Sequence, residues 1–219
     1  LKVPAQIAAA DPVAVRGFLA RHGAVVVKPV RGEQGRGVAV DVRSIEGVEA
    51  AIAEARAICE RVIVEEFVAG EDLRLLVIDQ ALVAAAIRRP PCVTGDGRSS
   101  VRELIEALSR RRAAATGGES RIPLDAETER CVHEAGLRLD DVPEPGTALR
   151  VRRTANLHTG GTIHDVTGEI HPDLAAAAVR VARAIEIPVV GVDFLIRSPT
   201  APAYAFIEAN ERPGLANHE

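Results

Sequence analysis

The chain has 219 residues, of which 47% are hydrophobic and 2% aromatic, and its net charge is −4 with both signs mixed along the sequence. This length can bury a substantial core, as one large domain or two small lobes, built from valine, leucine, isoleucine and alanine. The mixed charge excludes a basic footprint for nucleic acid or a membrane surface, and no stretch approaches the roughly 20 apolar residues of a membrane span.

The first third of the chain alternates strand and helix signals. In chain order, we expect a strand broken by Pro4, a helix with apolar residues at helical spacing, a hairpin, a helix capped by Ser44 and a returning strand. We assign these elements to residues 1–7, 12–22, 23–41, 44–58 and 61–67. The alternation predicts a small α/β lobe over residues 1–67.

The hairpin carries a glycine-rich tip. A β-branched run ends at Lys28, and Gly32, Gly35 and Gly37 follow before a second apolar run. Glycines permit backbone angles that let a loop present several N–H groups to phosphate oxygens, and Lys28 would add a positive charge. An ordinary hairpin, whose glycines serve only the turn, is the alternative. The loop is neither a P-loop nor a dinucleotide fingerprint, because no Gly-Lys-Ser/Thr sequence follows and a strand comes next.

An acidic corner follows the returning strand. Glu65 and Glu66 end that strand, Phe67 and Val68 continue the chain, and Asp72 precedes a further apolar strand. This strand covers residues 73–78 and turns at residues 79–80 into a return strand over residues 80–89. The corner is either a solvated connection between strands or the edge of a binding site.

Residues 91–147 have the composition of an insertion that covers a site. They contain an amphipathic helix over residues 100–112, a polar loop over residues 113–123 and a short helix that begins after Asp125. A flexible and basic segment of this kind is suited to closing over a carboxylate-bearing substrate. Packing on the larger lobe without any contact to substrate is the alternative.

A strand over residues 148–153 ends in a polar loop. Arg153 and Asn156 lie there, and Gly160 and Gly161 follow. Guanidinium groups bind phosphate or carboxylate oxygens through two parallel hydrogen bonds, and an asparagine adds an uncharged donor. The alternative is a surface loop whose basic residues are only solvated.

Two strands near the end of the sequence carry the strongest signal. Residues 189–196 form an apolar run that contains Asp193, and residues 203–210 end in Glu208 and Asn210. The alternation of side chains along a strand puts Glu208 and Asn210 on the same face. Three oxygen-bearing side chains, two of them anionic, suit Mg²⁺. A carboxylate satisfied within an edge strand is the alternative.

These motifs, in this order between residues 28 and 214, resemble the ATP-grasp ligases. The lysine before a glycine-rich loop, and Asp193 with Glu208-Ala209-Asn210 ahead of Arg212-Pro213-Gly214, carry the resemblance. It implies an α/β (α+β) fold of two lobes, each with a mainly antiparallel sheet and helices, with the nucleotide between them. Residues 1–67 would form the small lobe with a glycine-rich lid and residues 68–219 the large lobe, while the N-terminal substrate lobe would be absent from this chain.

The resemblance also implies roles for individual residues. Glu65 would accept from the adenine amino group, the backbone near Phe67 and Val68 would pair with the ring edge, and Asp72 would bind the ribose hydroxyls. The residues implied to bind ATP are Lys28, Gly32, Gly35, Gly37, Glu65, Glu66, Phe67, Val68 and Asp72. Arg74, Arg153 and Asn156 would act in catalysis, and Asp193, Glu208 and Asn210 would hold the metal. Many members carry an arginine two residues before the metal-binding aspartate, where this chain has Gly191.

The sequences of residues 95–107, 155–172 and 208–219 are most similar to the central ligase domains of cyanophycin synthetase and especially of N-acetylglutaminylglutamine synthetase. The resemblance implies an ADP-forming ligase that joins a carboxylate to an amine, each an amino acid or short peptide, through an acylphosphate. Its cofactors would be ATP and one or two Mg²⁺ ions, for which Mn²⁺ could substitute. A nucleotide-binding module that regulates without turnover, and a structural domain without a ligand, are the alternatives.

The sequence also bears on cellular context. The three cysteines, Cys59, Cys92 and Cys131, are widely spaced and odd in number, so we expect reduced thiols in a cytoplasmic protein. We expect no nucleic-acid or membrane partner. Association with further copies of the chain is left open.

Overall fold

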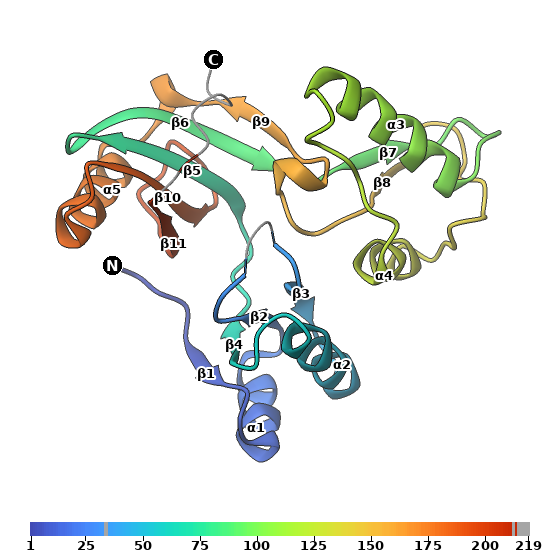
Figure 1. The fold of residues 1–219 in the computed structure, drawn as a ribbon, viewed down its shortest axis with the longest axis horizontal. Coiled ribbons are helices and arrows are strands. Elements are labelled where there is room, and N and C mark those ends of the chain that lie inside the picture. Colours follow the sequence, from blue (N-terminus) through green and yellow to red (C-terminus); the bar gives the residue numbers. More distant parts are fainter. Residues whose placement is uncertain (33–34, 212, 214–219) are drawn as a thin grey trace. The chain divides into compact units, whose positions relative to one another are not determined.

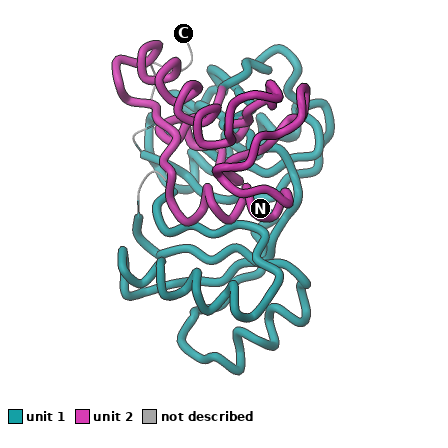
Figure 2. Tube along the Cα trace, turned by 90° about the vertical axis from the view of Figure 1, so that its right-hand side faces the viewer, with its two compact units in different colours: residues 1–88, 163–219 teal, residues 89–162 magenta. Residues whose placement is uncertain are grey.

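The computed structural model describes residues 1–32, 35–211 and 213 (Figure 1). It divides into two compact units, one of residues 1–88 and 163–219 and one of residues 89–162 (Figure 2). Helices and mainly antiparallel sheets occur together in the chain, which confirms the expected α/β class. The second unit contains the expected insertion, residues 91–147, and extends beyond it at both ends. The expected boundary between lobes at residue 67 stays a prediction.

The first sheet has four antiparallel strands with two helices on one face. Its strands, in spatial order, are β1 (Gln6–Ala8), β4 (Val62–Glu66), β2 (Val25–Pro29) and β3 (Ala39–Val42). The helices are α1 (Pro12–His22) and α2 (Ile45–Arg56). Alternate strand residues such as Val25, Val27 and Val64 are fully buried against Phe18 and Val48 of the helices. Residues between them, including Lys28 and Glu65, therefore lie on the opposite face.

Both helices of this sheet begin at side-chain caps. The Asp11 carboxylate accepts from the backbone N–H of Val13, and the Ser44 hydroxyl accepts from that of Gly47. The expected cap at Ser44 is thus confirmed. Gly23 closes α1 in the left-handed conformation, with φ 73°, and donates its N–H to the carbonyl of Leu19.

The second sheet has five strands and is covered on one face by a helix. Its strands, in spatial order, are β11 (Tyr204–Asn210), β10 (Val189–Ile196), β5 (Glu71–Ile78), β6 (Ala81–Arg89) and β9 (Thr162–Asp165). Helix α5 (Pro172–Ile185) packs Leu174, Ala178 and Val181 against Leu75 and Phe194 of the sheet (Figure 1). The side chains that alternate with this buried set point to the face opposite α5.

Sequence reasoning did not assign α5. Its buried residues, Leu174, Ala177, Ala178, Val181 and Ala182, recur at the spacing of one helix face, and Pro172 lies in its first turn. The short 3₁₀ turn η2 (Thr167–Glu169) precedes it. The apolar face of α5 is what allows one side of the five-stranded sheet to be a core while the other side carries polar residues.

The second unit is built around a two-stranded sheet and two helices. Its elements are β7 (Cys92–Thr94), α3 (Val101–Ala115), α4 (Ala126–Glu134), β8 (Ala148–Arg150) and the 3₁₀ turn η1 (Leu157–Thr159). Ser100 and Glu103 form a capping box at the start of α3, and the Asp125 carboxylate accepts from the N–H of Thr128 at the start of α4. Both helices were expected, whereas β7 was not and β8 is shorter than predicted. None of the described helices combines the length and apolar character needed to cross a bilayer.

Candidate nucleotide and metal site

A buried carboxylate lies at the centre of the polar face of the five-stranded sheet. Asp193 of β10 is 2% exposed and lies directly opposite Arg74 of β5 in the antiparallel register. The Arg74 Nε and Nη2 atoms donate to the two Asp193 oxygens, with 2.7 Å between Nη2 and Oδ2. Burial opposes ionisation, but the charges of Arg88 and Arg74 outweigh it and hold the pKa of Asp193 below its usual value. Asp193 is therefore ionised and held between the positive charges of Arg74 and Arg88.

Arg88 is the second cation on Asp193, and sequence reasoning missed it. Its Nη2 lies 2.9 Å from Asp193 Oδ2 and 2.6 Å from Asp72 Oδ1, so it bridges two carboxylates. Burial and the nearby Asp193 charge raise the pKa of Asp72 to about 6, against the opposing effect of Arg88. Asp72, which was expected to contact ribose, is thus already engaged within the sheet.

Glu208 and Asn210 of β11 share the face of Asp193. Glu208 lies opposite Asp193 and Asn210 opposite Gly191 in the register. The Asn210 Nδ2 donates to Glu208 Oε1 at 3.0 Å. The structure therefore brings together the three side chains that the sequence suggested as metal ligands.

A β-bulge between β10 and β11 makes this arrangement possible. Asp193 pairs with Glu208, but the next residue, Phe194, pairs with Phe206, so Ile207 has no opposite residue. In a regular strand Phe206 and Glu208 would share one face. The extra residue lets Phe206 pack edge-on against Phe194 in the core while Glu208 faces Asp193.

The donor chemistry of this set fits a hard divalent cation. Within residues 1–32, 35–211 and 213, no group of three or more His, Cys, Asp or Glu side chains could hold a metal ion. Two carboxylates together with the amide oxygen of Asn210 would nevertheless give Mg²⁺ the oxygen ligands it prefers, with room left for water or phosphate oxygens. A carboxylate offers about four acceptor positions, so the arginine contacts of Asp193 are compatible with a cation on the same group.

Arg74 fills the space beside Gly191. A Cβ atom on Gly191 would lie 3.2 Å from both Cδ and Nη1 of Arg74 and 3.0 Å from Cβ of Pro213. A larger side chain at position 191 would therefore displace Arg74. Because residue 191 is a glycine, Arg74 of the neighbouring strand can lie over it, two residues before Asp193.

The first sheet carries a second polar pair, on its face opposite the helices. The Lys28 Nζ lies 2.7 Å from Oε2 of Glu65, which is 8% exposed. Glu66 accepts from the N–H of Ala5 at 3.3 Å, and the N–H of Phe67 donates to the carbonyl of Ala24. Lys28 and Glu65 are thus fixed against each other, and the Phe67 N–H is used within the sheet.

The glycine-rich loop between β2 and β3 depends on glycine conformation. Gly35 and Gly37 have φ values of 70° and 68°. A Cβ on Gly37 would approach Cδ1 of Ile58 to 2.7 Å, so both backbone angle and space favour glycine there. Glu33 and Gln34, at the tip of the expected lid, lie outside the described residues, as do Arg212 and Gly214.

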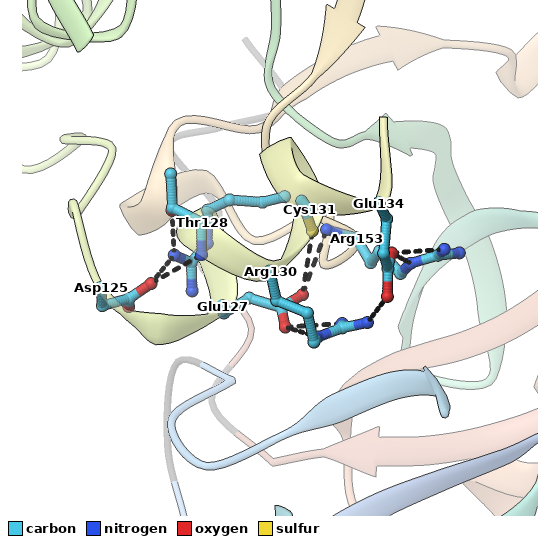
Figure 3. Close-up of polar contacts among 8 residues, drawn as sticks. Asp125, Glu127, Thr128, Arg130, Cys131, Glu134 and Arg153 are labelled. Carbon is cyan, nitrogen blue, oxygen red and sulfur yellow. Dashed lines mark hydrogen bonds and ion pairs between the residues drawn. The ribbon is translucent and has the colours of Figure 1, made fainter. Parts of the chain in front are cut away.

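Arg153 and Asn156 belong to the second unit. The Arg153 Nη2 donates to Glu134 Oε2 at 2.8 Å (Figure 3). The Asn156 carboxamide oxygen accepts from the N–H of His158 at 2.8 Å and caps η1. The expected catalytic residues are therefore divided between the units, with Arg74 in the first and this pair in the second.

Two family models match the chain, one at each end. Residues 2–112 match the ATP-grasp domain of prokaryotic glutathione synthetase, and residues 147–219 match the RimK-like ATP-grasp domain. Cyanophycin synthetase from Nostoc sp. is 39% identical over 201 residues, which make up 89% of this chain and 22% of that protein. The glutathione biosynthesis bifunctional protein from Mannheimia succiniciproducens is 32% identical over 210 residues, 89% of this chain and 27% of that protein. The chain spans about a fifth of the length of the curated cyanophycin synthetases it matches.

Solved structures share the fold. A bifunctional glutathione synthetase from Pasteurella multocida superposes with a TM-score of 0.57 and 27% identity over 98% of this chain and 31% of that one. A D-alanine–D-alanine ligase from Bacillus anthracis gives a TM-score of 0.59 with 12% identity, over 98% of this chain and 53% of that one. The second likeness concerns the fold alone.

Proposed function

Because this chain belongs to the ATP-grasp family of ligases, we propose that it is the ATP-binding part of an enzyme that joins a carboxylate to an amine with release of ADP and phosphate. The observation that carries the proposal is the meeting of Asp193, Glu208 and Asn210 on the polar face of the five-stranded sheet, with Arg74 and Arg88 on the same carboxylate. Such a set offers ligands for Mg²⁺ and positive charge for phosphoryl oxygens at one place.

The proposed reaction has two steps. In the first, an oxygen of the substrate carboxylate attacks the γ-phosphorus of ATP, the bond from that phosphorus to the β–γ bridging oxygen breaks, and ADP leaves. In the second, the amine nitrogen attacks the acyl carbon of the acylphosphate, phosphate leaves, and the nitrogen loses a proton. Arg74, Arg88 and Arg153 neutralise negative charge on the phosphoryl and acyl oxygens. Mg²⁺ bound to Asp193, Glu208 and Asn210 would neutralise charge on the ATP phosphates.

The nucleotide contacts follow from the first sheet and the acidic corner. Lys28 would bind phosphate oxygens together with the N–H groups of the loop that contains Gly35 and Gly37. Glu65 would accept from the adenine amino group while it holds Lys28, since a carboxylate has about four acceptor positions. Asp72 can bind a ribose hydroxyl in addition to Arg88 for the same reason. We further propose that Arg74 supplies the charge that other members place at the position of Gly191, because it already lies over that glycine.

The substrates are proposed at the level of class. The sequence of residues 95–107 and 155–172 favours an acyl-glutamine acid with a glutamine-like amine, as in N-acetylglutaminylglutamine synthetase. The 39% identity to a cyanophycin synthetase favours the synthesis of cyanophycin instead. A regulatory nucleotide-binding module is the second candidate function, in which the contacts to nucleotide and metal would serve binding without turnover.

Phosphate release by the full-length protein tests the proposal. We expect release that requires ATP, Mg²⁺, an acid and an amine together, measured with acetylated glutamine as the acid and glutamine as the amine, and with cyanophycin as the acid and an amino acid as the amine. Omission of the amine or addition of a chelator should reduce the rate to background. ATP binding in calorimetry without phosphate release from any acid and amine pair would favour the regulatory module.

Lys28→Met is expected to weaken ATP binding by about 1.5 to 3 kcal/mol, the range for a lost charge-assisted hydrogen bond, which is about 10- to 150-fold in affinity. Titration calorimetry measures the change. The substitution also leaves Glu65 without its cation, so the melting temperature is measured alongside. Lys28→Arg keeps the charge and should retain most of the affinity. Equal ATP affinity in Lys28→Met and the wild type would show that Lys28 serves only the pair with Glu65.

A further inference from the structure

One isoleucine lies against both arms of the glycine-rich loop that joins β2 to β3. A Cβ atom on Gly37 would lie 2.7 Å from Cδ1 of Ile58, and a Cβ atom on Gly32 would lie 3.9 Å from Cγ2 of the same side chain. Gly32 belongs to the arm that leaves β2, and Gly37 belongs to the arm that returns to β3. The two arms of the loop therefore meet at a single apolar side chain.

The end of helix α2 sets the position of this isoleucine. The N–H groups of Ile58 and Cys59 both donate to the carbonyl of Ala55, at 3.1 and 3.0 Å. Further along the same connection to β4, the carbonyl of Arg61 accepts from the N–H of Val30 at 2.8 Å, where the loop leaves β2. Ile58 thus projects from a hydrogen-bonded turn that is itself tied to the loop, which is a firmer support than a free segment would be.

The loop needs an external support because its own residues provide little. Gly35 and Gly37 take left-handed backbone angles, with φ values of 70° and 68°. Glycine has more backbone freedom to lose than any other residue, and it has no side chain with which to pack. Backbone N–H groups bind an anion well only when their directions are fixed beforehand. Ile58 supplies the apolar contact that the glycines lack.

Folding stability alone does not account for this contact. Ile58 is 38% exposed, whereas Val48, Ala51 and Ala55 of α2 are buried in the core of the first sheet. Hydrophobic stabilisation grows with the apolar area removed from water, so a partly exposed isoleucine contributes less of it than a buried one. A single exposed apolar side chain is common on protein surfaces and needs no explanation. Contact with both arms of one loop is the feature that calls for one.

We propose that Ile58 is a positioning residue for nucleotide binding, which supports the two arms of the glycine-rich loop so that the N–H groups of Gly35 and Gly37 are held in place for phosphate oxygens. This inference rests on the proposed function. Ile58 acts through the loop and does not contact the nucleotide itself. It adds to the site a residue from the connection between α2 and β4, a segment in which the sequence shows no phosphate-binding motif.

Ile58→Ala in the full-length protein tests the inference. We expect the Kd for ATP, measured by titration calorimetry, to rise about 2- to 10-fold, the range for one lost hydrogen bond. KM for ATP should rise by a similar factor, while kcat at saturating ATP stays near the wild-type value. Hydrogen exchange at the Gly35, Gly37 and Val38 amides should be faster in the free variant than in the free wild type. Ile58→Leu keeps the apolar volume and should retain most of the affinity.

The matched control is Ile185→Ala. Ile185 is the last residue of α5 and is 39% exposed, close to the 38% of Ile58, but α5 packs on the five-stranded sheet and not on the loop. Both alanine variants should lower the melting temperature by a similar small amount, because both remove the same atoms from similar exposure. Only Ile58→Ala should change the Kd for ATP, since a purely structural loss leaves the affinity of the folded protein unchanged.

The outcomes separate the positioning role from the function on which it rests. A wild-type Kd for ATP in Ile58→Ala, or an equal loss of affinity in Ile185→Ala, would overturn the positioning role and leave the ligase function intact. Calorimetry does not depend on turnover, so this result stands whichever acid and amine the enzyme uses. If the wild-type protein binds no ATP in the presence of Mg²⁺, the proposed function fails and the inference fails with it.

Discussion

Glu208→Gln is expected to lower Mg²⁺-dependent phosphate release by the full-length protein at least about 100-fold, the upper range for loss of groups that merely support a metal site. Glu208 lies opposite Asp193, and it supplies one of the two negative charges of the set. Glutamine keeps the shape and one oxygen but removes the charge that a divalent cation requires. Glu208 is exposed, and a glutamine in its place can still hydrogen-bond both Asn210 and Asp193, so the melting temperature should not change.

The control for Glu208→Gln is Glu169→Gln. Glu169 is an exposed glutamate of η2 on the same unit, outside the set of metal ligands. The Glu169→Gln variant should release phosphate at the wild-type rate. The Mg²⁺ concentration for half-maximal rate is measured for both variants. Full activity of Glu208→Gln at the same Mg²⁺ requirement would show that the cation is bound elsewhere.

Asp193→Asn is expected to abolish turnover and, unlike Glu208→Gln, to destabilise the fold by about 3 to 5 kcal/mol, the cost of breaking a buried ion pair. The neutral amide would leave Arg74 without its carboxylate and Arg88 with Asp72 alone, in a site where Asp193 is 2% exposed. For a chain of this length, that loss corresponds to a fall in melting temperature of about 6 to 20 °C.

Denaturant unfolding of Asp193→Asn and of Asp140→Asn measures the difference. Asp140 pairs with Arg102 on the surface, with 82% of its side chain exposed, so its loss should change the unfolding free energy by less than about 1 kcal/mol. If Asp193→Asn unfolds at the wild-type denaturant concentration, the two arginines do not depend on its charge. The network would then contribute no more to the unfolding free energy than a surface ion pair does.

Local signals in the sequence predicted much of the fold. Ser44, Ser100 and Asp125 are capping residues whose side chains each accept a hydrogen bond from the backbone N–H three residues on, and each helix begins where its cap predicts. The turn at Asp79 and Gln80, both with positive φ, was equally local. Helix α5 had comparable apolar periodicity and was missed because no motif drew attention to its segment.

The surroundings of Asp193 could not be predicted in the same way. From the pair Ile78 and Ala81 next to the turn, a regular hairpin would place Ile87 opposite Asp72. An irregularity between Leu76 and Val77 shifts the register by one, so that Arg88 faces Asp72 instead. A sequence gives no direct sign of such a shift, and a shift of one residue exchanges the two faces of a strand. The sequence could therefore not predict that Arg88 is a partner of Asp193.

The unpaired Ile207 has a consequence for how this chain can vary in evolution. Its side chain can change with little effect on pairing, since no residue of β10 lies opposite it. Its deletion would remove the bulge, but Phe206 would still lie opposite Phe194 and Glu208 opposite Asp193, because consecutive strand residues point to opposite faces. Among related sequences, position 207 should therefore vary in identity and tolerate a one-residue gap, and neither change would by itself mark a chain that has lost the cation site.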